Sequence, residues 1–195
     1  VVAVKADSPY KTIEELVAAA KEKGNLKAST NGNKASNHTA AQLLAKSAGF
    51  KYKAIPYGGT ADQLLALRQG EVDFTCAKVA DVAKLVKGDK PELRVLAVFN
   101  TKRDPELPNV PTLGEKGLYP EWYGSARALV APKGTKPEVI QYYVEAFKKT
   151  MQDPAVIEAH KKAGMALDFK DNKELGDLIK AQDKFARDVV NDLYK

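Results

Sequence analysis

Short apolar runs alternate with amphipathic segments along this chain, and this alternation restricts its fold more than any other feature. The apolar runs, each bounded by turn residues, predict buried strands at 26–30, 52–56, 72–76 and 94–99. The segments before and between them predict helices at 12–24, 36–47, 60–70 and 79–86. Strands that alternate with helices indicate an α/β fold with a largely parallel sheet, and we expect that class here.

Capping signals mark several of the helix starts. Thr12-Ile-Glu-Glu15 and Thr60-Ala-Asp-Gln63 both have capping-box spacing, in which two side chains satisfy free N–H groups at a helix start. Asp153-Pro154 predicts a later start, with the carboxylate as the cap and proline in the first turn. These signals predict where three of the helices begin.

The second half of the chain has a different pattern. Four prolines within 102–120 predict a crossing between two lobes. After it, the pattern predicts a long strand at 122–131, helices at 137–152 and 172–193, and a short strand at 165–169.

Composition excludes several classes of protein. Hydrophobic residues make up 44% of the 195 and charged residues 29%, which rules out a disordered chain or a fibre. No apolar run approaches the roughly 20 residues that a membrane-spanning helix needs. The net charge of +6 comes from dispersed lysines without interleaved aromatic residues, so we expect no nucleic-acid partner.

No set of residues has the spacing of a catalytic or metal site. His38 and His160 each lack a second histidine or a cysteine at metal-ligand spacing. The single cysteine, Cys76, has apolar neighbours and is typical of a core residue; a nucleophile pair with His38 is the alternative. We therefore predict no catalytic residue, no metal and no cofactor.

Two loops, 30–38 and 56–61, each lie between the end of a predicted strand and the start of a predicted helix. In open α/β sheets ligands bind outside the carboxyl ends of the strands, where free N–H groups and the helix dipole favour anions. Small residues let a ligand approach the backbone, and Ser36 and Thr60 add hydroxyl groups. Two interpretations stay open on these residues: a carboxylate or phosphate site, or two ordinary capped turns.

Several segments follow one family's pattern in order. They are Asn31-Gly32, His38-Thr-Ala-Ala41, Ile55-Pro-Tyr-Gly-Gly-Thr-Ala61, Gly70-Glu-Val-Asp73, Arg94-Val-Leu-Ala-Val98, Lys102-Arg-Asp-Pro105 and Leu107-Pro-Asn-Val-Pro-Thr112. In these segments the chain resembles the extracytoplasmic substrate-binding proteins of tripartite tricarboxylate transporters, the TctC or Bug family. The resemblance runs over essentially the whole chain.

The resemblance implies a type II periplasmic-binding-protein-like α/β fold, with one complete lobe plus the C-terminal part of a second. Residues 1–4 would be a crossing strand and 5–121 the ligand-binding lobe. Residues 122–195 would be a returning strand and helices of the partial first lobe. Family members carry a further segment before the first strand, so we expect a fragment, or a chain completed by self-association through the incomplete lobe. In that case the last helices would expose apolar faces, and such patches drive association.

The family's function would be capture of a small organic carboxylate outside the cytoplasm, in the periplasm, and its delivery to the transporter's membrane permease subunits. The resemblance therefore implies a solute-binding protein, not an enzyme. Two alternatives remain: a ligand-sensing effector domain of a transcription regulator, and a small cysteine-dependent enzyme.

Ligand-binding residues carried over by position fall into three groups. One side of the pocket would consist of Thr30, Asn31, Gly32 and Ser36, the other of Tyr57, Gly58, Gly59, Thr60 and Ala61, and the floor of Cys76 and Ala77. The chain departs from the pattern at Lys34, where a glycine is usual, and at Asn37, where a proline is common. Lys34 would contact a dianion or face water, and we favour water. His38 matches the pattern, and we expect it to be structural.

Overall fold

The computed structural model describes residues 1–165 and 167–194. Two compact units divide the chain: unit 1 is Val1–Gly124 and unit 2 is Ser125–Lys195. Unit 1 contains all the described strands, and the described residues of unit 2 form helices and irregular segments.

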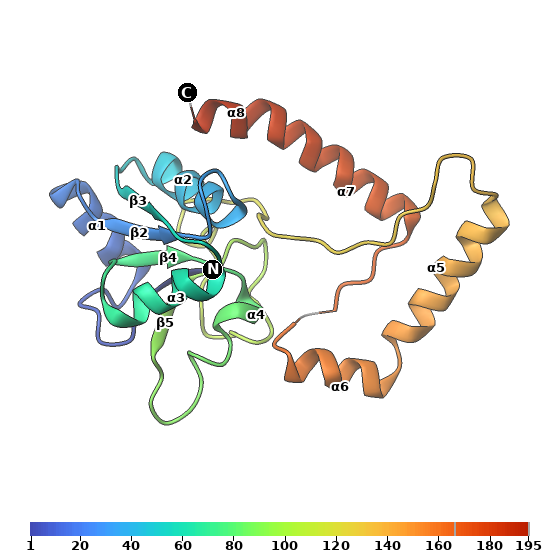
Figure 1. Ribbon diagram of the computed structural model, residues 1–195, viewed down its shortest axis with the longest axis horizontal. Helices are drawn as coiled ribbons and strands as arrows, with labels where there is room; N and C mark the ends of the chain where they lie inside the picture. Colours follow the sequence, from blue (N-terminus) through green and yellow to red (C-terminus); the bar gives the residue numbers. More distant parts are fainter. Residues whose placement is uncertain (166, 195) are drawn as a thin grey trace. The chain divides into compact units, whose positions relative to one another are not determined.

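Unit 1 is an α/β lobe built on one five-stranded sheet (Figure 1). Its elements are β1 (Val2–Lys5), α1 (Ile13–Lys23), β2 (Lys27–Thr30), α2 (Ser36–Ala48), β3 (Lys53–Pro56), α3 (Thr60–Gln69), β4 (Phe74–Cys76), α4 (Val79–Val82) and β5 (Leu93–Ala97). The strand order is β3-β2-β4-β1-β5, with β2 parallel to β3 and β4 and with β1 antiparallel to β4 and β5. Four strands therefore run in one direction, which confirms the predicted α/β class.

The sheet has a topological switch point between β2 and β4, where the connections that follow two neighbouring strands lead in opposite directions. From β2 the chain passes through α2 to β3 on one side, whereas from β4 it continues through α4 to β5 on the other side. Right-handed crossovers place α2 and α3 on opposite faces of the sheet (Figure 1). In open α/β sheets, ligands bind outside the carboxyl ends of the strands at such a switch point.

Packing around β4 forms the centre of the core. The Phe74 side chain is fully buried, and its ring meets Phe50 and Tyr52 edge to face, with centroids 6.3 Å and 5.6 Å away. β1 adds the fully buried Val2 and Val4 from the neighbouring strand. These apolar runs form strands because burial on the sheet removes their side chains from water.

One predicted helix start is confirmed, and another is wrong in detail. The Thr12 hydroxyl caps α1 by accepting the Glu15 N–H at 3.2 Å. At α3, however, the N-cap is Gly59, and Thr60 is the first helical residue and caps nothing. The Gln63 side chain points into the protein instead of capping the helix, because it finds hydrogen-bond partners at the ends of the strands.

Unit 2 contains α5 (Pro137–Met151), α6 (Pro154–Lys162), α7 (Asn172–Phe185), a π-helical turn η1 (Ala186–Val190) and α8 (Asn191–Leu193). Asp153 caps α6 as predicted, since its carboxylate accepts the Ala155 N–H at 2.8 Å. Asp171 and Glu174 form a complete capping box at α7. No helix among the described residues is long and apolar enough to cross a membrane.

Several other local predictions are wrong. Residues 122–131 are irregular, as are the described residues of 165–169; Ala166 lies outside them. A strand needs a neighbour to pair with, and no paired strand is described beyond β5. The predicted helix at 79–86 ends at Val82. The proline-rich segment 102–120 is no crossing: its Leu107, Leu113 and Tyr119 are buried in unit 1.

The helices of unit 2 expose their apolar faces. No residue of α5, α6 or α7 is buried, although the large apolar side chains are spaced for one face. The exposed side chains include Val139, Tyr142, Tyr143, Phe147, Ile157 and Ile179. The predicted exposure of apolar faces after residue 137 is therefore confirmed.

Candidate ligand-binding site

Three loops meet at the carboxyl ends of β2, β3 and β4, and they carry the predicted site residues. Thr30 at the end of β2 is paired in register with Pro56 at the end of β3, and the Tyr57 N–H donates to the Thr30 carbonyl at 2.9 Å. On the other side of β2, Ser29 is paired with Thr75 of β4. Parallel strands therefore bring the segments 30–36, 57–61 and 76–77 to one edge of the sheet.

Two helices begin at this edge without a side-chain cap at the N-cap position. The N-cap residues are Ala35 for α2 and Gly59 for α3, and neither supplies a capping atom. In the part of the chain that the structure describes, the N–H groups of Thr60, Ala61 and Asp62 have no protein acceptor. Free N–H groups at the positive end of a helix favour an anion, which is what the two loops were predicted to bind.

The first loop, 31–35, is held in an unusual backbone conformation. Gly32 has φ +127° and Lys34 has φ +58°, both in the region that favours glycine. The buried Thr30 hydroxyl donates to the Gly32 carbonyl at 3.3 Å, and the Asn31 Oδ1 accepts the Asn37 N–H at 3.2 Å. Lys34 therefore occupies a left-handed backbone conformation that favours glycine, and its side chain is exposed.

His38 has a structural role in the same loop. Its Nδ1 accepts the backbone N–H of Lys34 at 2.9 Å, which requires a neutral imidazole with the proton on Nε2. Burial lowers the pKa of His38 below its ordinary value and so favours that neutral form. The ring therefore fixes the turn before α2.

In the second loop, 57–59, two of the three residues are glycines, so the backbone makes up most of its surface. The Tyr57 hydroxyl donates to the Glu71 carboxylate at 3.1 Å, and partial burial together with this carboxylate raises the pKa of Tyr57. Gly58 is exposed, whereas Gly59 is half-buried and fully extended at φ 177°. Asp62, in the first turn of α3, lies against Gly58.

The third segment, Cys76 and Ala77, is buried beneath the edge. The Cys76 side chain has no exposed surface, and burial raises the pKa of its thiol to about 12. A thiol that stays protonated is a poor nucleophile, which argues against cysteine-dependent catalysis. No group of three or more histidine, cysteine, aspartate or glutamate residues in 1–165 and 167–194 is placed to hold a metal ion.

The sequence patterns did not predict the roles of two residues at this edge, Gln63 and Tyr123. Gln63 joins α3 to the ends of β2 and β4, but its spacing from Thr60 pointed to a capping role. Tyr123 donates from its hydroxyl to the Ser36 carbonyl at 3.2 Å. Nothing local marks Tyr123, because it is 87 positions from Ser36 in the sequence.

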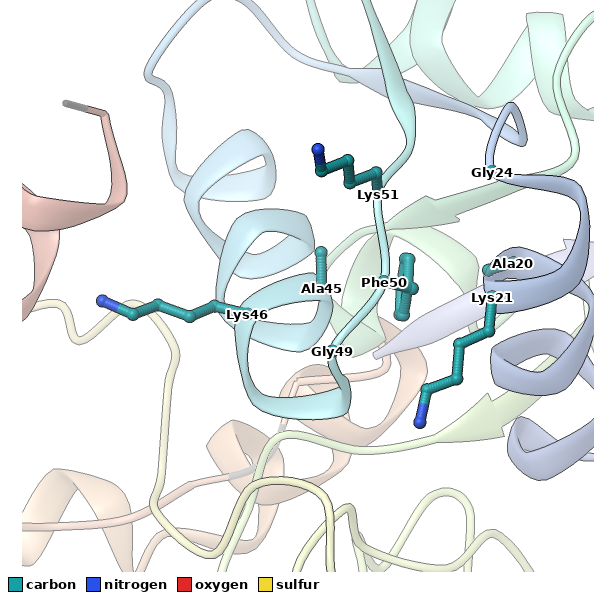
Figure 2. Close-up of a pocket in the computed structure, with 8 residues that line it drawn as sticks. All are labelled: Ala20, Lys21, Gly24, Ala45, Lys46, Gly49, Phe50 and Lys51. Carbon is teal, nitrogen blue, oxygen red and sulfur yellow. The ribbon is translucent and has the colours of Figure 1, made fainter.

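A hollow of about 410 Å³ lies at the opposite edge of the sheet, where α1 and α2 end (Figure 2). Its lining consists of Ala20, Lys21, Gly24, Ala45, Lys46, Gly49, Phe50 and Lys51. Figure 2 shows the Phe50 ring between the two helix ends and the lysine side chains extending away from it. Lys21 and Lys46 lie in the last turns of α1 and α2, where a lysine complements the helix dipole. None of the residues that line this hollow is a predicted site residue.

The α/β lobe, with its helix-start loops at a sheet switch point, has the fold of solute-binding proteins of the periplasmic type. Residues 1–193 match the family model described as the tripartite tricarboxylate transporter family receptor, TctC. The chain belongs to this family, and the predicted resemblance is confirmed.

Related proteins agree with this assignment. A UPF0065 protein of Cupriavidus necator is 38% identical over 152 residues, covering 77% of this chain and 45% of that protein. The crystal structure of a TctC solute-binding protein from Polaromonas is 28% identical with a TM-score of 0.86, covering 98% of this chain and 65% of that one. An R. palustris protein solved with adipate shares the fold: it is 22% identical with a TM-score of 0.79, covering 95% of this chain and 63% of that one. The chain thus spans about half the length of the curated relatives it matches.

Proposed function

We propose that this chain is the ligand-binding part of an extracytoplasmic solute-binding protein that captures a small organic carboxylate for a tripartite tricarboxylate transporter. Residues 5–121 would form the ligand-binding lobe, residues 1–4 a crossing strand, and residues 122–195 part of the other lobe. In the whole protein, ligand contacts to both lobes would favour a closed form. That form would deliver the ligand to the membrane permease subunits in the periplasm.

One observation carries the proposal: the uncapped N-terminus of α3 lies at the carboxyl edge of the strands, beside the start of α2. Three N–H groups there are without an acceptor among the described residues, and the segments 30–36 and 57–61 are joined by the hydrogen bond from Tyr57 to Thr30. Backbone N–H donors at a helix start suit a carboxylate. The buried, protonated Cys76 supports binding rather than covalent chemistry.

Thermal unfolding with and without ligand tests this function. The probes are adipate, malate, citrate, benzoate, glutamate and inorganic phosphate, with adipamide as an uncharged control of adipate's length. A carboxylate at a hundred times its Kd stabilises the folded state by about 2.7 kcal/mol, whereas adipamide has no effect. A well-folded sample that none of the carboxylates stabilises contradicts the proposal.

A pair of variants at position 60 locates the ligand. Proline is well tolerated at the first position of a helix, and Gly59 before it is already extended, so Thr60→Pro removes the N–H and the hydroxyl while keeping α3. Thr60→Ala removes the hydroxyl alone. Because a hydrogen bond to a charged group contributes about 1.5–3 kcal/mol, we expect Thr60→Pro to weaken carboxylate binding at least ~10-fold relative to Thr60→Ala in calorimetry. Equal affinities of the two variants would place the ligand elsewhere.

We also propose that the exposed faces of unit 2 bind a second copy of this chain. Tyr142 is 71% exposed, and Tyr143 and Ile179 are each 54% exposed, which leaves a large apolar surface in water. Light scattering at several protein concentrations should give a mass above that of one chain, and Tyr142→Lys should lower it. A monomer of the unchanged protein at all concentrations contradicts this association.

A further inference from the structure

The Gln63 side chain is fully buried at the start of α3, and its amide orientation is fixed. Its Nε2 donates to the carbonyls of Ser29, at 3.2 Å, and Cys76, at 2.7 Å, and to the Thr75 hydroxyl. The flipped amide would set its oxygen against these two carbonyl oxygens. Gln63 therefore attaches the start of α3 to the ends of β2 and β4.

The opposite end of the same amide reaches the first turn of α2. Gln63 Oε1 accepts a hydrogen bond from Asn37 Nδ2 at 2.8 Å, and Asn37 is itself 4% exposed. The Asn37 backbone N–H in turn donates to Asn31 in the first loop at 3.2 Å. One chain of hydrogen bonds thus joins the first loop, both helix starts and two strand ends.

We propose that the contact between the side-chain amides of Asn37 and Gln63, the Asn37–Gln63 bridge, fixes the spacing of the two ligand loops. Both are positioning residues for the ligand site, and this inference rests on the proposed function. Buried polar groups that are hydrogen-bonded to one another make the surrounding structure rigid, because a shift would leave a buried amide without its partner. Loops held in this way lose little freedom when a ligand binds, which increases affinity.

The test compares Asn37→Ala with Asp73→Ala in the full chain. Asn37→Ala removes the bridge but keeps the contacts of Gln63 with the strands. Asp73 accepts the Lys27 N–H at 2.7 Å at the other end of the same two strands, so Asp73→Ala is a control that removes a hydrogen bond far from the loops. Urea unfolding measures the stability lost in each variant.

Amide hydrogen exchange is the first readout and needs no ligand. The N–H groups of Thr39 and Gln63 make the first turns of the two helices, to Ala35 and Gly59. After correction for global stability, we expect these two amides to exchange about tenfold faster in Asn37→Ala than in Asp73→Ala. Equal exchange in the two variants would overturn the bridge's positioning role.

Calorimetry with the tightest-binding carboxylate of the panel is the second readout. We expect Asn37→Ala to raise its Kd about tenfold and Asp73→Ala to leave it unchanged. Faster exchange with an unchanged Kd would show a purely structural bridge and overturn the inference. If the unchanged protein binds no carboxylate, the proposed function fails, while the exchange data still decide whether the bridge holds the loops.

Discussion

Replacing Phe74 by alanine is expected to lower the free energy of unfolding of unit 1 by about 3–5 kcal/mol. The side chain is fully buried, and its removal leaves a cavity beneath β4 that Phe50 and Tyr52 line edge to face. These rings come from the segment between α2 and β3, so the cavity also loosens the packing of α2 against the sheet.

Urea unfolding followed by tryptophan fluorescence measures this loss. The single tryptophan, Trp122, belongs to unit 1, so its emission reports on this lobe. Leu65→Ala is the matched control, because Leu65 is 44% exposed on α3 and its truncation should change the unfolding free energy by at most about 0.5 kcal/mol. Similar losses for the two variants would mean that β4 does not organise the core as described.

The second large effect is expected for Gly32→Ala. The backbone of Gly32 has φ +127°, a conformation that L side chains rarely adopt, so the change should cost about 1–3 kcal/mol of stability. The Gly32 carbonyl accepts hydrogen bonds from the Thr30 hydroxyl and from the Ala35 N–H. If the loop relaxes to relieve the strain, it loses these contacts, and carboxylate affinity falls as well.

Gly59→Ala is the control for backbone strain. Gly59 has φ 177°, an extended conformation that any residue adopts, and an added Cβ meets no atom within 4 Å. Unfolding in urea should therefore separate the two variants clearly, with Gly59→Ala close to the unchanged protein. Equal stability of both variants would contradict the backbone conformation of the first loop.

Local signals predicted much of unit 1. The strands near 28, 54, 75 and 95 and the helices after Thr12, Ser36 and Gly59 lie where apolar periodicity and small-residue loops placed them. The predictions fail where an element depends on a distant partner. Residues 122–131 have the composition of a strand, yet they are irregular in the structure, because a strand forms only against a neighbouring strand.

At the candidate site, too, local features were predictable from the sequence and contacts between distant residues were not. The loops 30–38 and 56–61 were found from the sequence because strand ends and helix starts have recognisable residues. The roles of Gln63 and Tyr123 were not, since hydrogen bonds to Cys76 and to Ser36 join positions that the chain alone does not relate. The same capping-box spacing marks a helix cap at Thr12-Ile-Glu-Glu15, whereas at Thr60-Ala-Asp-Gln63 it ends in a buried side chain that bridges to Asn37.

The sequence by itself determined the α/β class, the family and the two loops, because these depend on periodicity, on turn residues and on the order of short motifs along the chain. The tertiary structure decided the strand order, the uncapped N-terminus of α3 and the inward orientation of Gln63. Local propensities act over a few residues. Which buried amide meets which carbonyl depends on strands that only the folded sheet brings together.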